Sequence, residues 1–406
     1  MAAESSALTK EDLKALLKPT LDAERAKIED ISIRYLTKPG DNYGSTMLAI
    51  DVRLSPGPRT LPIVAKMLPK SIALQEAFQC ERTVRKEIYL YTRVRPAYEQ
   101  IQRENNVPED KFIDVFPVCY GARISSKGDS GPVDETSVIL QENLRTQGFE
   151  CGDRTIGLNL AHCKLVVDKL ARFHATAVAM KIRKPELFKE TVIPAADPLV
   201  MGDVDIVGIQ PLKNIPEYET MKERIEAAVK KGCALFGTPQ TPREPFATIT
   251  HLDLWTNNIM FQYDPSSSKD HPTSLKFVDF QITGYGSPAR DLLFFLYSSA
   301  QLQVLSKHYD YLVRLYYDNF VDCLKVLGCD TTPFSFENFM KEMKYASAIE
   351  FYHIAFMLPP ISVAPEDAVS TADMTHDDLS SFAKIGKSYT DRARKFILDF
   401  SSRNWI

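Results

Sequence analysis

The stretch His251-Leu252-Asp253-Leu254-Trp255-Thr256-Asn257-Asn258 decides how this chain is interpreted. It places a carboxylate, Asp253, shortly before an amide, Asn258. A second stretch, Lys276-Phe277-Val278-Asp279-Phe280-Gln281, adds another carboxylate after apolar residues. Carboxylate and amide oxygens suit proton transfer and the binding of a hard divalent cation, so the two stretches together indicate a catalytic centre.

The order H-x-D-x-x-x-x-N followed by D-F-Q is typical of enzymes that transfer a phosphoryl group from ATP. Such a reaction needs one carboxylate to accept the proton of the substrate hydroxyl, and oxygen ligands to hold Mg²⁺ on the phosphates. The pattern therefore predicts Asp253 as the catalytic base and Asn258 and Asp279 as the metal ligands, with D-F-Q where protein kinases have D-F-G.

A kinase also needs a lysine on the third strand and a glutamate on the following helix to orient it. Val64-Ala65-Lys66 ends the third predicted strand, and we expect Lys66 to contact the α- and β-phosphates of ATP. Glu76, Glu81 and Glu87 all lie on the next predicted helix. We favour Glu87 as the partner of Lys66 because Ile88 and Tyr91 place an apolar face beside it.

The phosphates of ATP need a covering loop between the first two strands. The segment 38–46 is a turn by composition, and Asn42, Tyr43, Gly44 and Ser45 within it are the expected phosphate contacts. The chain has no G-x-x-x-x-G-K-[ST] motif, which argues against a P-loop phosphotransferase.

The composition is that of an ordinary globular protein, with 44% hydrophobic and 25% charged residues among 406. A net charge of −4 gives no sign of binding to nucleic acid or to an anionic membrane. Seven widely spaced cysteines predict free thiols in a reducing compartment. With no signal peptide and no apolar run long enough to span a membrane, we expect a soluble cytoplasmic protein without an obligate protein partner.

Hydrophobic periodicity predicts a small mixed lobe followed by a larger helical one. The predicted strands are 31–35, 48–54, 61–67, 115–124, 137–140, 259–263 and 275–279. The predicted helices are one after the Thr9–Asp12 capping box that stops at Pro19, one over 71–95 that Pro96 ends or kinks, and others over 158–180, 216–236, 287–328, 335–358 and 379–400. We expect the segment 359–374 to be irregular.

The order of V-A-K, helix glutamate, Gln141-Glu142-Asn143-Leu144, H-x-D-L-W-x-N-N and V-D-F-Q resembles the ecdysteroid kinase-like family of arthropods. This family is grouped with the choline and aminoglycoside kinases. The resemblance covers about residues 40 to 400. It implies an α+β, two-lobed protein-kinase-like fold, with a mixed-sheet N-lobe at 1–143 and a mainly helical C-lobe at 144–406.

The same resemblance implies further roles. Residues Gln141, Glu142, Asn143 and Leu144 would hold adenine through backbone hydrogen bonds, and Asp291 would brace the catalytic loop. The expected activity is ATP- and Mg²⁺-dependent phosphorylation of a hydroxyl on an ecdysteroid or a similar lipophilic alcohol. Helices after residue 287 and the segment 359–374 would form the acceptor pocket. Leu252 departs from relatives, which often carry Gly at that position.

Two other functions stay open at this point. A kinase for choline, another amine alcohol or a xenobiotic would use the same catalytic residues, but the sequence shows no clear acidic and aromatic cluster for a cation. A pseudokinase that only binds a hormone would not need Lys66, Asp253, Asn258 and Asp279 together.

Several polar and aromatic residues are better explained by packing. We interpret His251 as a structural histidine that bonds backbone and Asp279, and His162 and His174 as packing residues on an amphipathic helix. Trp255 and the aromatic residues Tyr345, Phe351, Tyr352 and Phe356 are expected mainly in the core, although some of the latter could line an apolar cleft.

Overall fold

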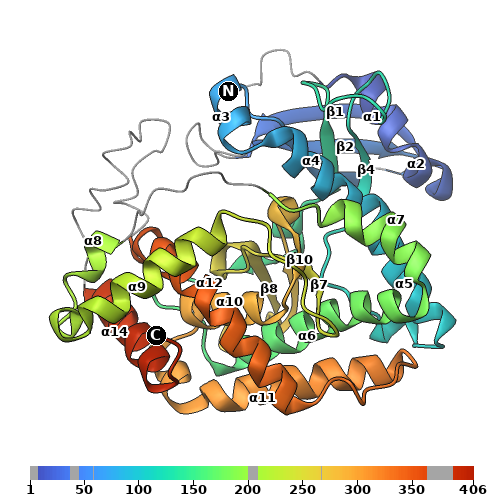
Figure 1. The fold of residues 1–406 in the computed structure, drawn as a ribbon. Coiled ribbons are helices and arrows are strands. Elements are labelled where there is room, and N and C mark those ends of the chain that lie inside the picture. Colours follow the sequence, from blue (N-terminus) through green and yellow to red (C-terminus); the bar gives the residue numbers. More distant parts are fainter. Residues whose placement is uncertain (1–7, 37–44, 58, 200–208, 267, 364–386) are drawn as a thin grey trace.

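A computed structural model describes residues 8–36, 45–57, 59–199, 209–266, 268–363 and 387–406. The described chain forms a β-sheet region near the N-terminus and a larger, mainly helical region beneath it in Figure 1. This is the two-lobed α+β arrangement that the sequence predicts.

The N-lobe is built on a five-stranded antiparallel sheet with the strand order β1-β2-β3-β5-β4. Its strands are β1 (Lys27–Tyr35), β2 (Thr46–Ser55), β3 (Arg59–Met67), β4 (Cys119–Arg123) and β5 (Val138–Glu142). Leu48, Ile50 and Val52 alternate along β2 and are buried against Leu13 and Leu17 of the N-terminal helices. The period-two pattern of the sequence thus identified the buried face of the sheet.

Two short helices cover that face. Helix α1 (Lys10–Leu16) begins with the predicted capping box, in which Thr9 and Asp12 satisfy each other's backbone N–H groups. We expected Pro19 to end the helical segment, but helix continues past it. It lies in the first turn of a second helix, α2 (Lys18–Glu24), where its missing N–H costs no hydrogen bond.

The helix predicted over 71–95 is divided. It consists of α3 (Ile72–Ala77), α4 (Cys80–Tyr89), a π-helical turn (Leu90–Val94) and α5 (Arg95–Glu104). Gln79, with a left-handed φ of 46°, separates α3 from α4. Of the two predicted effects of Pro96, an end or a kink, the end is wrong, because the helical segment continues as α5 to Glu104. The wider π-helical turn lies directly before Pro96. Because proline has no backbone N–H, the regular α-helical hydrogen-bond pattern cannot continue through it.

The C-lobe contains most of the helices. They are α6 (Leu160–Arg183), α7 (Pro185–Ala195), α8 (Ile209–Leu212), α9 (Tyr218–Phe236), α10 (Ala289–Ser299), α11 (Leu302–Val326), α12 (Phe336–Ser362) and α14 (Lys387–Ser402). Helix α7 was not predicted. Helix α12 runs through Pro359 and Pro360, so the irregular segment expected from residue 359 begins later. Residues 364–374 of that segment lie outside the described residues.

Short strands carry the catalytic segments through the middle of the C-lobe. Strands β8 (Ile259–Tyr263) and β9 (Pro272–Phe277) form the predicted hairpin, with β6 (Glu150–Cys151) at its edge. Strands β7 (Thr248–Thr250) and β10 (Gly284–Gly286) form a separate two-stranded ribbon. The ribbon brings the residues before the catalytic loop beside those that follow Asp279.

Helix α5 and the chain segment that follows it are bonded to the helical region. Tyr98 donates its hydroxyl to the carbonyl of Phe173 in α6, and Phe277 donates its backbone N–H to Val115. These bonds join residues on the two sides of the expected boundary between the lobes, at residues 143 and 144. The position of that boundary stays a prediction. The sheet with its flanking helix and the helical region together form the expected two-lobed α+β arrangement.

No helix within the described ranges is both long and apolar enough to cross a membrane.

Candidate active site

Lys66 lies at the centre of a partly buried charge cluster. Its Nζ is 2.6 Å from Glu87 Oε2 and 2.7 Å from Asp279 Oδ1. Burial alone would lower the pKa of Lys66, but the charges of Asp279 and Glu87 outweigh it and raise that pKa. Lys66 is therefore a permanent cation that links β3, α4 and the segment after β9.

Of the three candidate glutamates on the helical segment, Glu87 is the one that meets Lys66. Its side chain is almost fully buried, and burial raises its pKa while the charge of Lys66 opposes this rise. Glu81 instead pairs with Arg85 and accepts the N–H of Val133, and Glu76 is exposed. The apolar face around Ile88 and Tyr91 explains why α4 turns Glu87 inward.

Asp253 and Asn258 are held against each other in the predicted catalytic loop, residues 251–258. The Asn258 amide nitrogen donates to both the backbone carbonyl and the Oδ2 of Asp253, each over 2.8 Å. Burial and the nearby charge of Asp279 raise the pKa of Asp253 to about 8, while hydrogen bonds from Asn258 and Trp255 act in the opposite direction. Trp255, which we expected only to pack, thus also contacts this carboxylate.

Asp291 binds the backbone of the catalytic loop. Its Oδ2 accepts the N–H of His251 over 2.6 Å, and its Oδ1 accepts the N–H of Leu252 over 2.8 Å. Asp291 lies in the first turn of α10 behind the N-cap Pro288, so it is not the cap of that helix. Its carboxylate therefore holds the loop by accepting these two N–H groups.

His251 has a structural role, but with different partners from those expected. Its Nε2 bonds the carbonyl of Val278 at 3.0 Å, and its Nδ1 faces the N–H of Asp253 at 3.3 Å. A neutral ring with the proton on Nε2 satisfies both contacts, and burial lowers the pKa of His251 accordingly. The bond links the catalytic loop to Val278, the neighbour of Asp279, and not to Asp279 itself.

The hinge residues follow directly from β5. The side chain of Glu142 is engaged within the protein, since it accepts the N–H of Val118 at 2.8 Å and the amide of Gln147 at 2.6 Å. Asn143 donates its N–H to Pro62. Leu144 opens a 3-10 turn (Leu144–Gln147), whose first N–H has no acceptor within the turn. The Glu142 side chain and the N–H groups of Glu142 and Asn143 are therefore already engaged, whereas the N–H of Leu144 is not used within the turn.

Residues Asn42, Tyr43 and Gly44 lie outside the described residues, so their predicted phosphate contacts are not placed. Ser45 precedes β2 and is buried, with its hydroxyl 3.6 Å from the sulfur of Met47.

The oxygen donors of Asn258 and Asp279 fit a small hard cation. The Asn258 amide nitrogen points to Asp253, which leaves its carbonyl oxygen available, and Lys66 engages only one of the two oxygens of Asp279. Among the described residues there is no group of three or more His, Cys, Asp or Glu side chains that could enclose a metal. A site with few protein ligands suits Mg²⁺, which retains waters and binds substrate phosphates.

Sequence reasoning missed the support behind Asp291. His174 of α6 is fully buried, with Nε2 at 3.0 Å from Asp291 Oδ2 and Nδ1 at 2.6 Å from the hydroxyl of Tyr316. Burial alone would raise the pKa of Asp291, but the hydrogen bond from His174 holds it below its usual value. The sequence showed only that His174 lies on the apolar face of an amphipathic helix, and packing was the simpler explanation for a histidine there.

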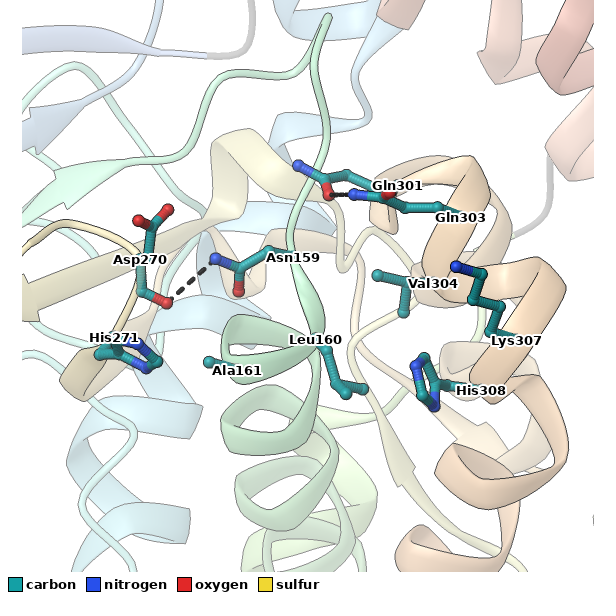
Figure 2. Close-up of a pocket in the computed structure, with 10 residues that line it drawn as sticks. All are labelled: Asn159, Leu160, Ala161, Asp270, His271, Gln301, Gln303, Val304, Lys307 and His308. Carbon is teal, nitrogen blue, oxygen red and sulfur yellow. Dashed lines mark hydrogen bonds between the residues drawn. The ribbon is translucent and has the colours of Figure 1, made fainter.

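A separate cavity of about 340 Å³ lies away from these residues. Figure 2 shows it between the start of α6, residues Asp270 and His271 of the β8–β9 hairpin, and the first turns of α11. The Asn159 amide donates to the carbonyl of Asp270 across one side of it. None of the predicted catalytic residues lines this cavity.

Comparison with known proteins identifies the family. A model of the ecdysteroid kinase-like family matches residues 39–329, which is more than half of the chain. The chain belongs to the ecdysteroid kinase-like family. It is accordingly a small-molecule kinase, a phosphotransferase with an alcohol group as acceptor. A search of curated protein sequences gave no match.

Solved structures were also compared with this kinase. An ethanolamine kinase from Plasmodium vivax is 12% identical, with 92% of this chain and 83% of that chain covered and a TM-score of 0.38. A spectinomycin phosphotransferase in complex with ADP and spectinomycin is 11% identical, with coverage of 95% and 97% and a TM-score of 0.43. A choline/ethanolamine kinase family protein from Mesorhizobium loti is 10% identical, with coverage of 90% and 92% and a TM-score of 0.35. The family assignment rests on the family model alone.

Proposed function

We propose that this kinase transfers the γ-phosphate of ATP to a hydroxyl group of an ecdysteroid or a similar lipophilic alcohol, with Mg²⁺ as the cation. The observation that carries the catalytic part is the cluster in which Lys66 contacts both Glu87 and Asp279. A protein that only bound a hormone would have no need for this buried arrangement of charges. The proposed class of acceptor, an ecdysteroid or a similar alcohol, is taken from the description of the family.

Each residue of the cluster has a role in this proposal. Lys66, oriented by Glu87, binds the α- and β-phosphates, and Asn258 and Asp279 hold Mg²⁺ through their oxygen atoms. Bound Mg²⁺ neutralises charge on the phosphates. Asp253 orients the acceptor hydroxyl and takes its proton, while Asn258 fixes the carboxylate of Asp253 from one side.

The nucleotide would be held from the N-lobe. The backbone of Glu142 and Leu144 receives adenine, because the Glu142 side chain is already engaged by Val118 and Gln147. Ser45 and the preceding residues 42–44 would cover the phosphates. We also propose a cytoplasmic location, which is supported by seven free cysteines.

The test is acceptor-dependent ATP consumption with Mg²⁺ by the purified protein. The panel contains ecdysteroids, other lipophilic alcohols, choline and aminoglycosides, and Asp253→Asn is the control. We expect turnover with a lipophilic alcohol and a loss of orders of magnitude in the variant. Turnover with choline alone would show that the acceptor is an amine alcohol and not a lipophilic alcohol. Undiminished turnover by Asp253→Asn would exclude Asp253 as the catalytic base.

A further inference from the structure

Lys86 of α4 is a buried amine without a partner. The residue is only 2% exposed, and its Nζ has no hydrogen-bond acceptor in the part of the chain that the structure describes. Lysine is seldom buried unless it is paired, because an ammonium group loses its hydration without compensation. Lys86 takes no part in the proposed phosphoryl transfer, so its position needs another explanation.

The amine lies where α4 meets the helical region. Helix α4 packs against α7 and against the 3-10 turn Phe280–Ile282, and Figure 1 shows α4 and α7 between the sheet and the C-lobe. The charge of Asp197, two residues beyond the end of α7, acts on Lys86. The end of α7 is also tied to the segment after Asp279, because Thr283 Oγ1 donates to the carbonyl of Ala195 over 2.6 Å.

The charges around Lys86 do not compensate it. Asp197 favours its ammonium form and Arg82, one turn earlier on α4, opposes it. Arg82 competes for the same carboxylate, with Nε at 3.8 Å from Asp197 Oδ2, and it donates Nη1 to the carbonyl of Pro198 over 3.3 Å. The charged residues of α3, the π-helical turn and α7, which also pack against α4, are all exposed: Glu76, Arg93, Glu186, Lys189 and Glu190.

Burial lowers the pKa of Lys86 to about 8; Asp197 opposes this shift, and Arg82 adds to it. A lysine in water titrates at about 10.4. Between these two values a released α4 binds a proton that the packed helix has lost, so packing becomes more favourable as pH rises. Well below pH 8 the amine is protonated in both states, and the full penalty of burying it remains.

We propose that Lys86 makes the packing of α4 on α7 depend on pH and thereby controls how tightly the kinase binds Mg-ATP. The inference rests on the proposed function, in which Lys66 and Glu87 act on the phosphates. Glu87 is the next residue of α4 and is bonded to Lys66 over 2.6 Å, so release of α4 also withdraws Glu87 from Lys66. Lys86 acts through Glu87 and is a positioning residue.

The two pKa values set the size of the effect. An amine that titrates at about 8 in the packed helix and at about 10.4 in the released one strengthens packing by about tenfold between pH 7 and pH 9. The part of the Mg-ATP affinity that depends on Lys86 therefore rises by up to about tenfold over this interval and is constant below it.

The test compares Lys86→Met with the wild type, because methionine is a flexible side chain without charge. Lys189→Met is the matched control: this lysine of α7 is 65% exposed, and its pair with Glu186 is a surface pair of little energetic value. The dissociation constant of Mg-ATP is measured by calorimetry, and the unfolding midpoint by thermal denaturation, from about pH 6 to about pH 9.5. Lys86→Leu repeats the test with a second uncharged side chain.

The ratio of each variant's dissociation constant to that of the wild type at the same pH is the readout, since ATP and other groups of the protein titrate in this range and cancel in it. We expect Lys86→Met to bind Mg-ATP up to about tenfold more tightly than the wild type at pH 7, and the two to converge towards pH 9. Its unfolding midpoint should exceed that of the wild type at pH 7, with a smaller difference at pH 9.5. Lys189→Met should keep a constant ratio.

The outcomes separate the switch from the proposed function. A pH-independent affinity ratio for Lys86→Met in an active kinase would overturn the switch and leave the proposed function intact. A difference in unfolding midpoint that narrows with pH while the affinity ratio stays constant would do the same, because Lys86 would then titrate without moving Glu87. If the wild type binds Mg-ATP but phosphorylates no alcohol, the acceptor class fails while the ratios still test the switch. A wild type that binds no Mg-ATP at any pH would contradict both.

Discussion

The imidazole of His174 and the carboxylate of Asp291 are hydrogen-bonded over 3.0 Å, and neither side chain is exposed to solvent. Because a carboxylate can only accept, Nε2 of His174 carries the proton, and Nδ1 accepts the hydroxyl of Tyr316. Asp291 in turn fixes the N–H groups of His251 and Leu252. A chain of hydrogen bonds therefore runs from α11 through α6 and α10 to the catalytic loop.

We predict that His174→Phe lowers kcat and destabilises the fold by about 1–3 kcal/mol. The variant removes one of the two hydrogen bonds that the buried Oδ2 of Asp291 accepts, the other coming from the N–H of His251, and loss of a hydrogen bond to a buried charged group is destabilising. Thermal unfolding and steady-state kinetics measure the two effects. Tyr316→Phe, which removes only the outer member of the chain, should have the smaller effect on kcat. A kcat for His174→Phe equal to that of the wild type would show that His174 only packs.

The sequence predicted those parts of the site that depend on local spacing. Lys66 lies near the end of an apolar strand, and Glu87 lies on the inward face of the next helix, so both were recognisable within a few residues of their own segments. The role of His174 was not recognisable in this way, because its partner Asp291 is 117 residues away in the chain. Periodicity shows only that His174 is buried, and not which group it meets.

Other differences come from tertiary contacts that override local signals. Pro96 usually ends a helix, but a π-helical turn before it allows α5 to continue and to pack Tyr98 against Phe173. Pro359 and Pro360 likewise lie within α12, in a segment buried beside other helices. Leu252 has a left-handed φ of 64°, which its residue type does not predict, and its N–H is bonded by the distant Asp291.

We predict that Asp279→Ala abolishes Mg²⁺-dependent binding of ATP. The substitution removes a proposed metal ligand and also one of the two acids that contact Lys66. Calorimetric titration of ATP with and without Mg²⁺ measures the effect. The variant should retain its fold, because Lys66 keeps its bond to Glu87 at 2.6 Å. ATP affinity that still depends on Mg²⁺ as in the wild type would exclude Asp279 as a ligand.

We predict that Glu87→Gln raises the KM for ATP by about tenfold and affects the acceptor KM less. Glutamine removes the charge that orients Lys66 and leaves Asp279 as its only buried counter-charge. Loss of a charge-assisted hydrogen bond is worth about 1.5–3 kcal/mol, which corresponds to a tenfold or larger change in affinity. Glu76→Gln, an exposed residue on the same helical segment, is the matched control. Equal KM values for the two variants would contradict the assignment of Glu87.

The raised pKa of Asp253 predicts how stability depends on pH. Burial, followed by the charge of Asp279, raises this pKa to about 8, whereas an aspartate in the unfolded chain titrates at about 3.9. Between these values the folded state keeps a proton that the unfolded state has lost. The contribution of Asp253 to the free energy of unfolding therefore falls as pH rises, until the folded carboxyl also ionises near pH 8.

Asp253→Asn removes this titration, so its stability relative to the wild type should increase as pH rises from about 5 to about 8 and then level off. Thermal unfolding of both proteins in metal-free buffer measures the difference. Asp391→Asn, at an exposed position in α14, should follow the wild type over the whole range. A constant difference between Asp253→Asn and the wild type would mean that the carboxyl is already ionised at low pH.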